Sequence, residues 1–204
     1  LDYTNTQINE EEKEKIRKKI IGADSIKIKI ACLFGSFDRL RNGYDVYVKI
    51  IEQFKTSYNE CPIKFAVYGE QSEQLQIYLH QKKVADDIIV IENYYSPNDV
   101  IAAIDIVVLP YRYCAFPLPL LKAQKFFKPV VASEVGIIPE IIFDGVNGYI
   151  LPVADYISFA EKISNLAENQ DLYNSIVENI KKSFKEFRLE DMVAKYSEIY
   201  SKFF

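Results

Sequence analysis

The chain has 204 residues, with 25 Lys and Arg against 29 Asp and Glu, and a net charge of −4. This length fits one large domain, and the hydrophobic content of 49% is typical of a globular protein with a buried core. The mild acidity disfavours a nucleic-acid partner, which would favour a basic face, and no apolar run approaches the length of a membrane span.

The cysteines and the histidine do not indicate a metal site or a histidine-based catalytic triad. Cys32, Cys61 and Cys114 are far apart and odd in number, so we expect buried thiols in a reducing compartment. His80 lies in a polar helical stretch, where a surface role is expected. We therefore expect no metal, no cofactor and no histidine-based triad.

Helical and strand patterns alternate along the chain. In chain order we expect a helix at 9–21, a strand at 25–35, a helix at 44–58, a strand at 63–69, a helix at 72–83, a strand at 87–93, a helix at 96–104, a strand at 105–110, a helix at 118–127, a strand at 128–133, a short helix at 138–145, a short strand at 148–152, and only helices at 155–204. Asn9 can cap the first helix, whose acidic residues precede its basic ones, as the helix dipole favours.

The strands are short, β-branched and apolar on both faces, which is typical of a parallel sheet covered by helices. We predict an α/β fold with a Rossmann-like, doubly wound parallel sheet of about six strands, helices on both faces and a helical C-terminal tail. A single domain is expected at 26–204, after an N-terminal helix and linker remnant at 1–25. In such a sheet, ligands bind beyond the carboxyl ends of the strands.

Two loops at that edge are candidate ligand sites. The segment "GSFDRLRNG" starts at Gly35, where backbone can approach a ligand closely, and Arg39 and Arg41 can meet phosphates; a solvated polar turn is the alternative. The segment "YRYCAFPLPLLKAQ" places backbone N–H groups of 115–121 at a helix N-terminus, which favours an anion, with Arg112 and Lys122 nearby. Its apolar residues can instead pack under the sheet.

A third segment follows the fifth strand. Glu134, Glu140 and Asp144 are the carboxylates near it, and nothing in the sequence places two of them together as an acid/base pair. For Glu140 a structural position at a helix start is favoured over one facing the crevice. The catalytic residues stay unknown.

The run "PYRYCAFPLPLLKAQKFFKPVVASEVGIIPEIIFDGVNGYILP" resembles the C-terminal, donor-binding half of a GT-B glycosyltransferase, of the large retaining family of group 1 type. The similarity extends over about residues 26–203. It implies a nucleotide-diphosphate sugar as donor, with the base and ribose near Tyr94 and the diphosphate at the first loop and at the helix that begins near Leu118. The donor-site residues expected on these grounds are Gly35, Ser36, Arg39, Arg41, Tyr94, Arg112, Cys114, Ala115, Phe116, Leu118 and Lys122.

The resemblance also exposes departures. Family members carry two glutamates eight positions apart, the first for the donor sugar and the second for the ribose hydroxyls, and Cys114 and Lys122 stand at those positions. An Arg and a Lys of the family's first loop are replaced by Ser36 and Asn42, with Arg39 and Arg41 as shifted substitutes. Donor binding is then either rearranged or weak or lost.

Two hypotheses remain. The first is the donor-binding domain of a hexosyltransferase that acts on a glycan or lipid-linked sugar, with an N-terminal acceptor domain or partner chain, inactive as an isolated half. The whole enzyme is expected in the cytoplasm, at the inner face of the membrane as a peripheral protein. The second is a degenerate, non-catalytic domain that serves as a binding or assembly module. An epimerase or response-regulator-like domain is disfavoured, because the glycine fingerprint and the acidic triad are absent.

Overall fold

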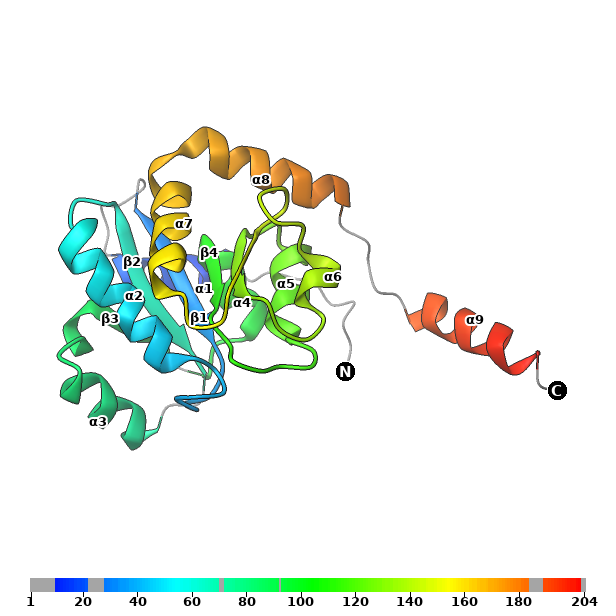
Figure 1. Ribbon diagram of the computed structural model, residues 1–204, viewed down its shortest axis with the longest axis horizontal. Coiled ribbons are helices and arrows are strands. Elements are labelled where there is room, and N and C mark those ends of the chain that lie inside the picture. The colour runs from blue at the N-terminus through cyan, green and yellow to red at the C-terminus, as the bar shows by residue number, and fades with distance from the viewer. Residues whose placement is uncertain (1–9, 22–27, 70–71, 92, 184–188, 203–204) are drawn as a thin grey trace.

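A computed structural model describes residues 10–21, 28–69, 72–91, 93–183 and 189–202 (Figure 1). Its six strands form one parallel sheet in the order β3-β2-β1-β4-β5-β6. The strands are β1 (Lys29–Phe34), β2 (Ile63–Tyr68), β3 (Ile88–Ile91), β4 (Ile106–Leu109), β5 (Val130–Ser133) and β6 (Tyr149–Leu151). The predicted doubly wound sheet of six strands is therefore confirmed.

Helices connect and follow the strands. They are α1 (Glu10–Ile21), α2 (Tyr44–Ser57), α3 (Glu73–Gln81), α4 (Pro97–Ala103), α5 (Leu118–Lys125), α6 (Ile138–Ile141), α7 (Tyr156–Glu168), α8 (Gln170–Ser183) and α9 (Leu189–Tyr200), with a short 3-10 helix η1 (Ala85–Asp87). The 3-10 helix was not predicted, and its last residue, Asp87, was predicted as the first residue of the following strand.

The predicted helix at 138–145 is shorter in the structure. It ends at Ile141, because the buried side chain of Asn147 takes over the following backbone groups. Asn147 accepts a hydrogen bond from the backbone N–H of Phe143 (2.7 Å) and donates one to the carbonyl of Ile141 (3.1 Å). A side-chain cap of this kind ends a helix before its sequence pattern runs out.

The sheet separates two apolar cores, so the fold has three layers (Figure 1). One core is formed with α2, α3, α7 and α8, and its largest buried side chains include Tyr44, Tyr47 and Phe159. The other is formed with α1, α4, α5 and α6 and includes Ile16, Ile101 and Leu120. The central strands are buried on both faces, as their β-branched sequences predicted.

Helix α1 is held to the sheet by Arg17. Its guanidinium donates hydrogen bonds to the carbonyls of Ala103 (2.8 Å) and Ile28 (3.2 Å) and forms an ion pair with Asp105 (3.1 Å). Because Ile16 beside it is buried in the α4–α5 core, α1 packs on the sheet through both residues. The predicted boundary between 25 and 26, like the Asn9 cap, lies outside the described residues.

Helix α9 lies away from the sheet and the other helices (Figure 1). Its exposed apolar side chains are Met192, Val193, Tyr196, Ile199 and Tyr200. Within the described ranges, no helix has both the length and the apolar character needed to cross a membrane.

Candidate functional site

The strand order reverses between β1 and β4, and the loops that leave these two strands meet at their carboxyl ends. In doubly wound sheets this switch point is where ligands bind. The β1–α2 loop spans residues 35–43 and the β4–α5 loop spans residues 110–117. The backbone N–H of Arg112 donates to the carbonyl of Arg41 (3.0 Å), so the structure joins the two segments that the sequence indicated separately.

Gly43 allows this contact. Its backbone is left-handed, with φ of 66°, and a Cβ atom there would lie 1.8 Å from the carbonyl oxygen of Pro110. Only glycine fits a backbone approach this close. The contact between the two loops is therefore made by their backbones.

The β1–α2 loop folds around two side chains. Asp38 accepts hydrogen bonds from the backbone N–H groups of Leu40 (3.2 Å) and Arg41 (2.9 Å). Phe37 turns inward and packs on the rings of Tyr44 and Tyr78, with centroids 5.1 and 5.4 Å away. The tip of the loop, from Asp38 to Arg41, is left exposed.

Ser36 and Asn42 hold the base of the same loop. The Nδ2 atom of Asn42 donates to the carbonyl of Ser36 at 2.8 Å. These are the two positions at which the resemblance led us to look for an Arg and a Lys. In this chain, Ser36 and Asn42 join the two ends of the loop by this hydrogen bond and carry no positive charge.

The predicted cations of the two loops differ in their surroundings. Arg39 is exposed, and the Arg41 guanidinium lies 5.8 Å from the ring centroid of Tyr113. Arg112 instead forms an ion pair from Nη2 to Oδ2 of Asp45, in the first turn of α2. The charge of Arg112 is thus compensated within the chain, whereas Arg39 and Arg41 present theirs at the loop surface.

The Arg112–Asp45 pair is incompletely satisfied. Arg112 Nε and Asp45 Oδ1 are both buried, and neither has a hydrogen-bond partner among the described residues. Buried polar atoms usually have partners, and exceptions concentrate where water or a ligand binds. This pair was not predicted from the sequence, because its members are 67 positions apart.

The β4–α5 loop is fixed at both ends. Tyr111 is buried and its hydroxyl donates to the carbonyl of Phe34 at the end of β1. Further along, Ile137 donates its N–H to the carbonyl of Ala115 (3.2 Å). A Cβ atom on Gly136, whose φ is 55°, would lie 1.8 Å from the carbonyl oxygen of Cys114. Segment 111–115 is therefore held between β1 and the β5–α6 connection.

The side chains of this loop are largely at the surface. Cys114 is half-buried and free of any disulfide, while Ala115 and Phe116 are exposed. No acceptor is found in the described part of the chain for the backbone N–H groups of Ala115 and Phe116. Leu120 N–H bonds the carbonyl of Pro117 (3.0 Å), so the predicted cradle of free N–H groups is narrower than 115–121.

The remaining predicted residues follow β3 or lie on α5. Tyr94 is 69% exposed and its ring lies 4.2 Å from that of Tyr95, whose carbonyl accepts from Tyr68 (2.7 Å). Leu118 is exposed at the start of α5, and Lys122 is half-buried one turn later. Burial lowers the pKa of Lys122 below its usual value.

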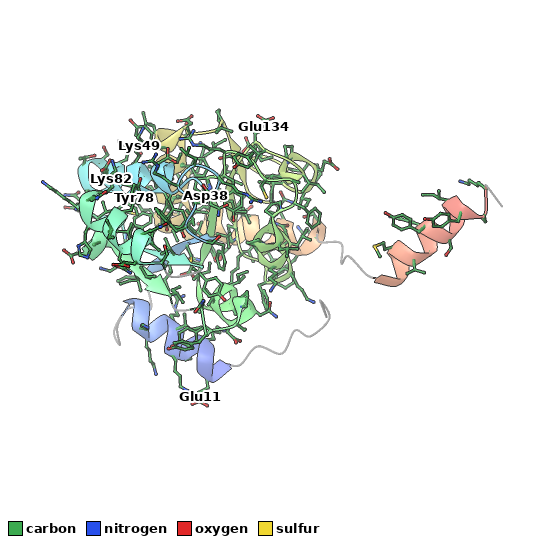
Figure 2. All side chains as sticks on the ribbon, turned by 90° about the horizontal axis from the view of Figure 1, so that it is seen from below. Glu11, Asp38, Lys49, Tyr78, Lys82 and Glu134 are labelled. Carbon is green, nitrogen blue, oxygen red and sulfur yellow. The ribbon has the colours of Figure 1, made fainter. Side chains whose placement is uncertain are left out.

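The other residues singled out in the sequence are two cysteines, the histidine and the carboxylates that follow β5. Cys32 and Cys61 are buried free thiols, and burial raises the pKa of Cys61 to about 11. His80 is exposed on α3. Glu134 lies on the opposite side of the body from Glu11 of α1 (Figure 2). Among the described residues, no three His, Cys, Asp or Glu side chains form a group that could hold a metal ion.

A family model described as "Glycosyl transferases group 1" matches residues 28–169. The chain therefore belongs to this family of glycosyltransferases, as its resemblance indicated, and the matched segment contains both the β1–α2 and the β4–α5 loop.

Two curated relatives are longer than this chain. The chain is 26% identical over 178 residues to N-acetyl-alpha-D-glucosaminyl L-malate synthase of Bacillus anthracis, covering 84% of this chain and 45% of that protein. It is also 26% identical over 209 residues to an uncharacterized 41.2 kDa protein in the cps region of Klebsiella pneumoniae, covering 98% and 54%. The chain thus spans about half the length of these curated relatives.

Solved structures share the fold. The C-terminal domain of a glycosyl transferase group 1 protein (LpcC) from Francisella tularensis matches with a TM-score of 0.61 and 24% identity, over 76% of this chain and 82% of that one. Anabaena HepE in complex with UDP-glucose matches with a TM-score of 0.76 and 18% identity, over 94% and 53%. Both structures share the fold of this chain, and the predicted α/β, Rossmann-like fold of a GT-B domain is confirmed.

Proposed function

We propose that this chain is the donor-binding domain of a glycosyltransferase. The observation that carries the proposal is the meeting of the β1–α2 and β4–α5 loops at the switch point of a family-matched domain. Arg39 and Arg41 place positive charge on the exposed part of the first of these loops. A diphosphate that leaves a sugar during transfer develops negative charge, which cations positioned in advance stabilise.

The whole enzyme is proposed to transfer a hexosyl unit from a nucleotide-diphosphate sugar to a glycan or lipid-linked acceptor. The acceptor would bind an N-terminal domain, because the chain spans about half of its relatives and active sites form between domains. We propose no metal in this reaction, with the charge of the diphosphate met by side chains. The cytoplasmic location, at the inner face of the membrane, stays a prediction.

Isothermal titration of the 204-residue chain tests donor binding. UDP, GDP and ADP, and one sugar derivative of each, are titrated at low ionic strength, where charge contacts are strongest. We expect one base to bind with a Kd in the micromolar range and its sugar derivative to share that preference. An Arg39→Gln, Arg41→Gln variant should weaken binding at least tenfold. Absence of binding by all six compounds contradicts the proposal.

The second candidate is a non-catalytic binding or assembly module. It is favoured by Cys114 and Lys122, which offer no carboxylate at the two positions where the resemblance implies glutamates. The whole protein, wild type and Cys114→Glu, Lys122→Glu, is assayed for hydrolysis and transfer of the preferred donor. Activity of the wild type supports the enzyme, whereas activity that appears only in the double variant supports the module.

A further inference from the structure

Lys122 lies on the second turn of α5, directly behind the β4–α5 loop. The buried face of α5 is formed by Leu120, Ala123 and Gln124, so Lys122 lies outside that face, one turn after Leu118. Side chains on a helix tilt toward its N-terminus. The stem of Lys122 is therefore directed over Leu118 toward the loop edge of the sheet, where the proposed donor binds.

The ammonium of Lys122 lacks a counter-charge. It is half-buried, and burial is what lowers its pKa. Within the described ranges it has no hydrogen bond or ion pair. This distinguishes it from Arg112, which Asp45 compensates, and from Arg41, which lies near the Tyr113 ring. A partly desolvated cation without a partner costs free energy that an anion can offset.

The helix around Lys122 also lacks negative charge. The first turn of α5 contains no acidic residue, and its N-cap, Pro117, makes no side-chain hydrogen bond. By contrast, Asp99 lies in the first turn of α4, and Asp155 caps α7. The N-terminus of α5 therefore has no carboxylate of the chain in its first turn, and the helix dipole favours an anion there. Lys122 itself lies in the last turn of α5, and its stem leads back toward this terminus.

We propose that Lys122 pairs with a diphosphate oxygen of the donor and is a specificity-determining residue of this domain. The proposal rests on the proposed donor-binding function. The positive charge that the β1–α2 loop lacks at Ser36 and Asn42 is then supplied from α5, on the other side of the crevice. The donor is held by its diphosphate at Lys122, with Arg39 and Arg41 on the facing loop.

The chemistry of the ammonium favours phosphate over the hydroxyl groups of a sugar. An ammonium has three N–H donors and no acceptor, and its bonds to phosphate oxygens are charge-assisted. A hydroxyl group can accept a bond from it but gains nothing from its charge. Lys122 should therefore distinguish a nucleoside diphosphate from the matching nucleoside.

The test compares binding of a nucleoside diphosphate and its nucleoside by isothermal titration. The 204-residue chain is used as wild type, Lys122→Gln, Lys122→Arg and, as control, Lys64→Gln on the exposed second residue of β2. UDP with uridine is one pair, GDP with guanosine and ADP with adenosine the others. We expect Lys122→Gln to weaken the diphosphate about tenfold and leave the nucleoside unchanged. Lys122→Arg should retain most of the affinity.

The outcomes separate this inference from the proposed function. If no diphosphate binds to the wild type, the donor-binding function fails and this inference fails with it. If a diphosphate binds and Lys122→Gln lowers the affinity of diphosphate and nucleoside equally, or of neither, Lys122 does not contact the diphosphate while donor binding stands. Unfolding curves of each variant, expected within about 0.5 kcal/mol of wild type, show that a loss of affinity is local.

Discussion

The guanidinium of Arg112 donates from Nη2 to Oδ2 of Asp45, and this ion pair joins the β4–α5 loop to the first turn of α2. Both side chains are partly buried, with 32% and 23% of their surfaces exposed. The carboxylate also lies at the positive end of α2, so it compensates a helix terminus and a cation together. The N-terminus of α2 is thereby occupied by a group of the chain itself.

Asp45→Asn should therefore have opposite effects on stability and on anion binding. Loss of the carboxylate leaves Arg112 partly buried and uncompensated, and we expect about 1–3 kcal/mol less free energy of unfolding in urea. The freed guanidinium and helix terminus should bind inorganic pyrophosphate several-fold more tightly, measured by titration. Asp87→Asn, which removes the more exposed Lys55 pair, is the control and should change neither quantity appreciably. Unchanged pyrophosphate affinity in Asp45→Asn would show that Arg112 points away from the crevice.

Gly43→Ala tests the backbone contact between the two loops. The new methyl group would meet the Pro110 carbonyl oxygen at 1.8 Å, so the loops must separate. We expect a loss of about 3 kcal/mol or more in the free energy of unfolding, together with weaker nucleotide binding.

Gly145→Ala is the matched control for this variant. Gly145 has a similar φ of 71°, but a Cβ atom there meets nothing within 4 Å. It should cost about 1 kcal/mol from backbone strain alone and leave binding intact. Equal losses in the two variants would mean that the Pro110 contact contributes nothing.

Lys128 makes the stability of the domain depend on pH in a defined direction. Its Nζ donates to the carbonyl of Ala102 (3.0 Å), and burial is the main cause that lowers its pKa to about 8, from 10.5. The unfolded chain therefore binds one more proton than the folded chain between pH 8 and 10.5. The Lys128 contribution to stability rises as pH increases through this window and is lost as pH falls back to 8.

Urea unfolding of wild type and Lys128→Met from pH 7 to 10 measures this contribution. The advantage of the variant over wild type should be greatest at pH 7–8 and shrink by about 2 kcal/mol toward pH 10. Lys64→Met, at an exposed site, should run parallel to the wild type throughout. Parallel curves for Lys128→Met as well would show that the Lys128 ammonium is fully hydrated in the folded state.

The sheet could be predicted because the pattern that indicates each strand or helix lies within one short segment of the sequence. Each strand is a short β-branched run, and each crossover carries a helical pattern, so a parallel, doubly wound sheet with right-handed crossovers follows from general rules of chain connection. The strand order β3-β2-β1-β4-β5-β6 was not part of this prediction. The end of α6 could not be predicted in this way. It depends on the amide of Asn147, whose burial is decided by packing against α8, where Ser183 Oγ lies 3.4 Å from Nδ2.

The sequence predicts which loops lie at the carboxyl edge of the sheet, but not which side chains in them pair with one another. The position of Gly35–Gly43 and of the residues after Leu109 follows from the carboxyl-edge rule. Whether a cation there is free depends on partners far along the chain, and Arg112 is 67 positions from Asp45. Asp38 and Asp45 were both missed, although an acid in the first turn of a helix is a common signal.

Arg17→Met should loosen α1 from the sheet. Arg17 satisfies two carbonyls and compensates Asp105, whose side chain is 13% exposed and otherwise accepts from the Ile30 N–H (2.9 Å). Methionine preserves the apolar stem but leaves this carboxylate largely buried without its cation, so we expect a loss of about 3 kcal/mol in urea unfolding. Lys15→Met on the same helix removes an exposed pair with Glu11 and should cost less than about 0.5 kcal/mol. In Arg17→Met, amide hydrogen exchange should become faster in α1 and in the C-terminal turn of α4, while β1 stays protected. Similar exchange in Arg17→Met and Lys15→Met would mean that Ile16, and not Arg17, holds α1 to the sheet.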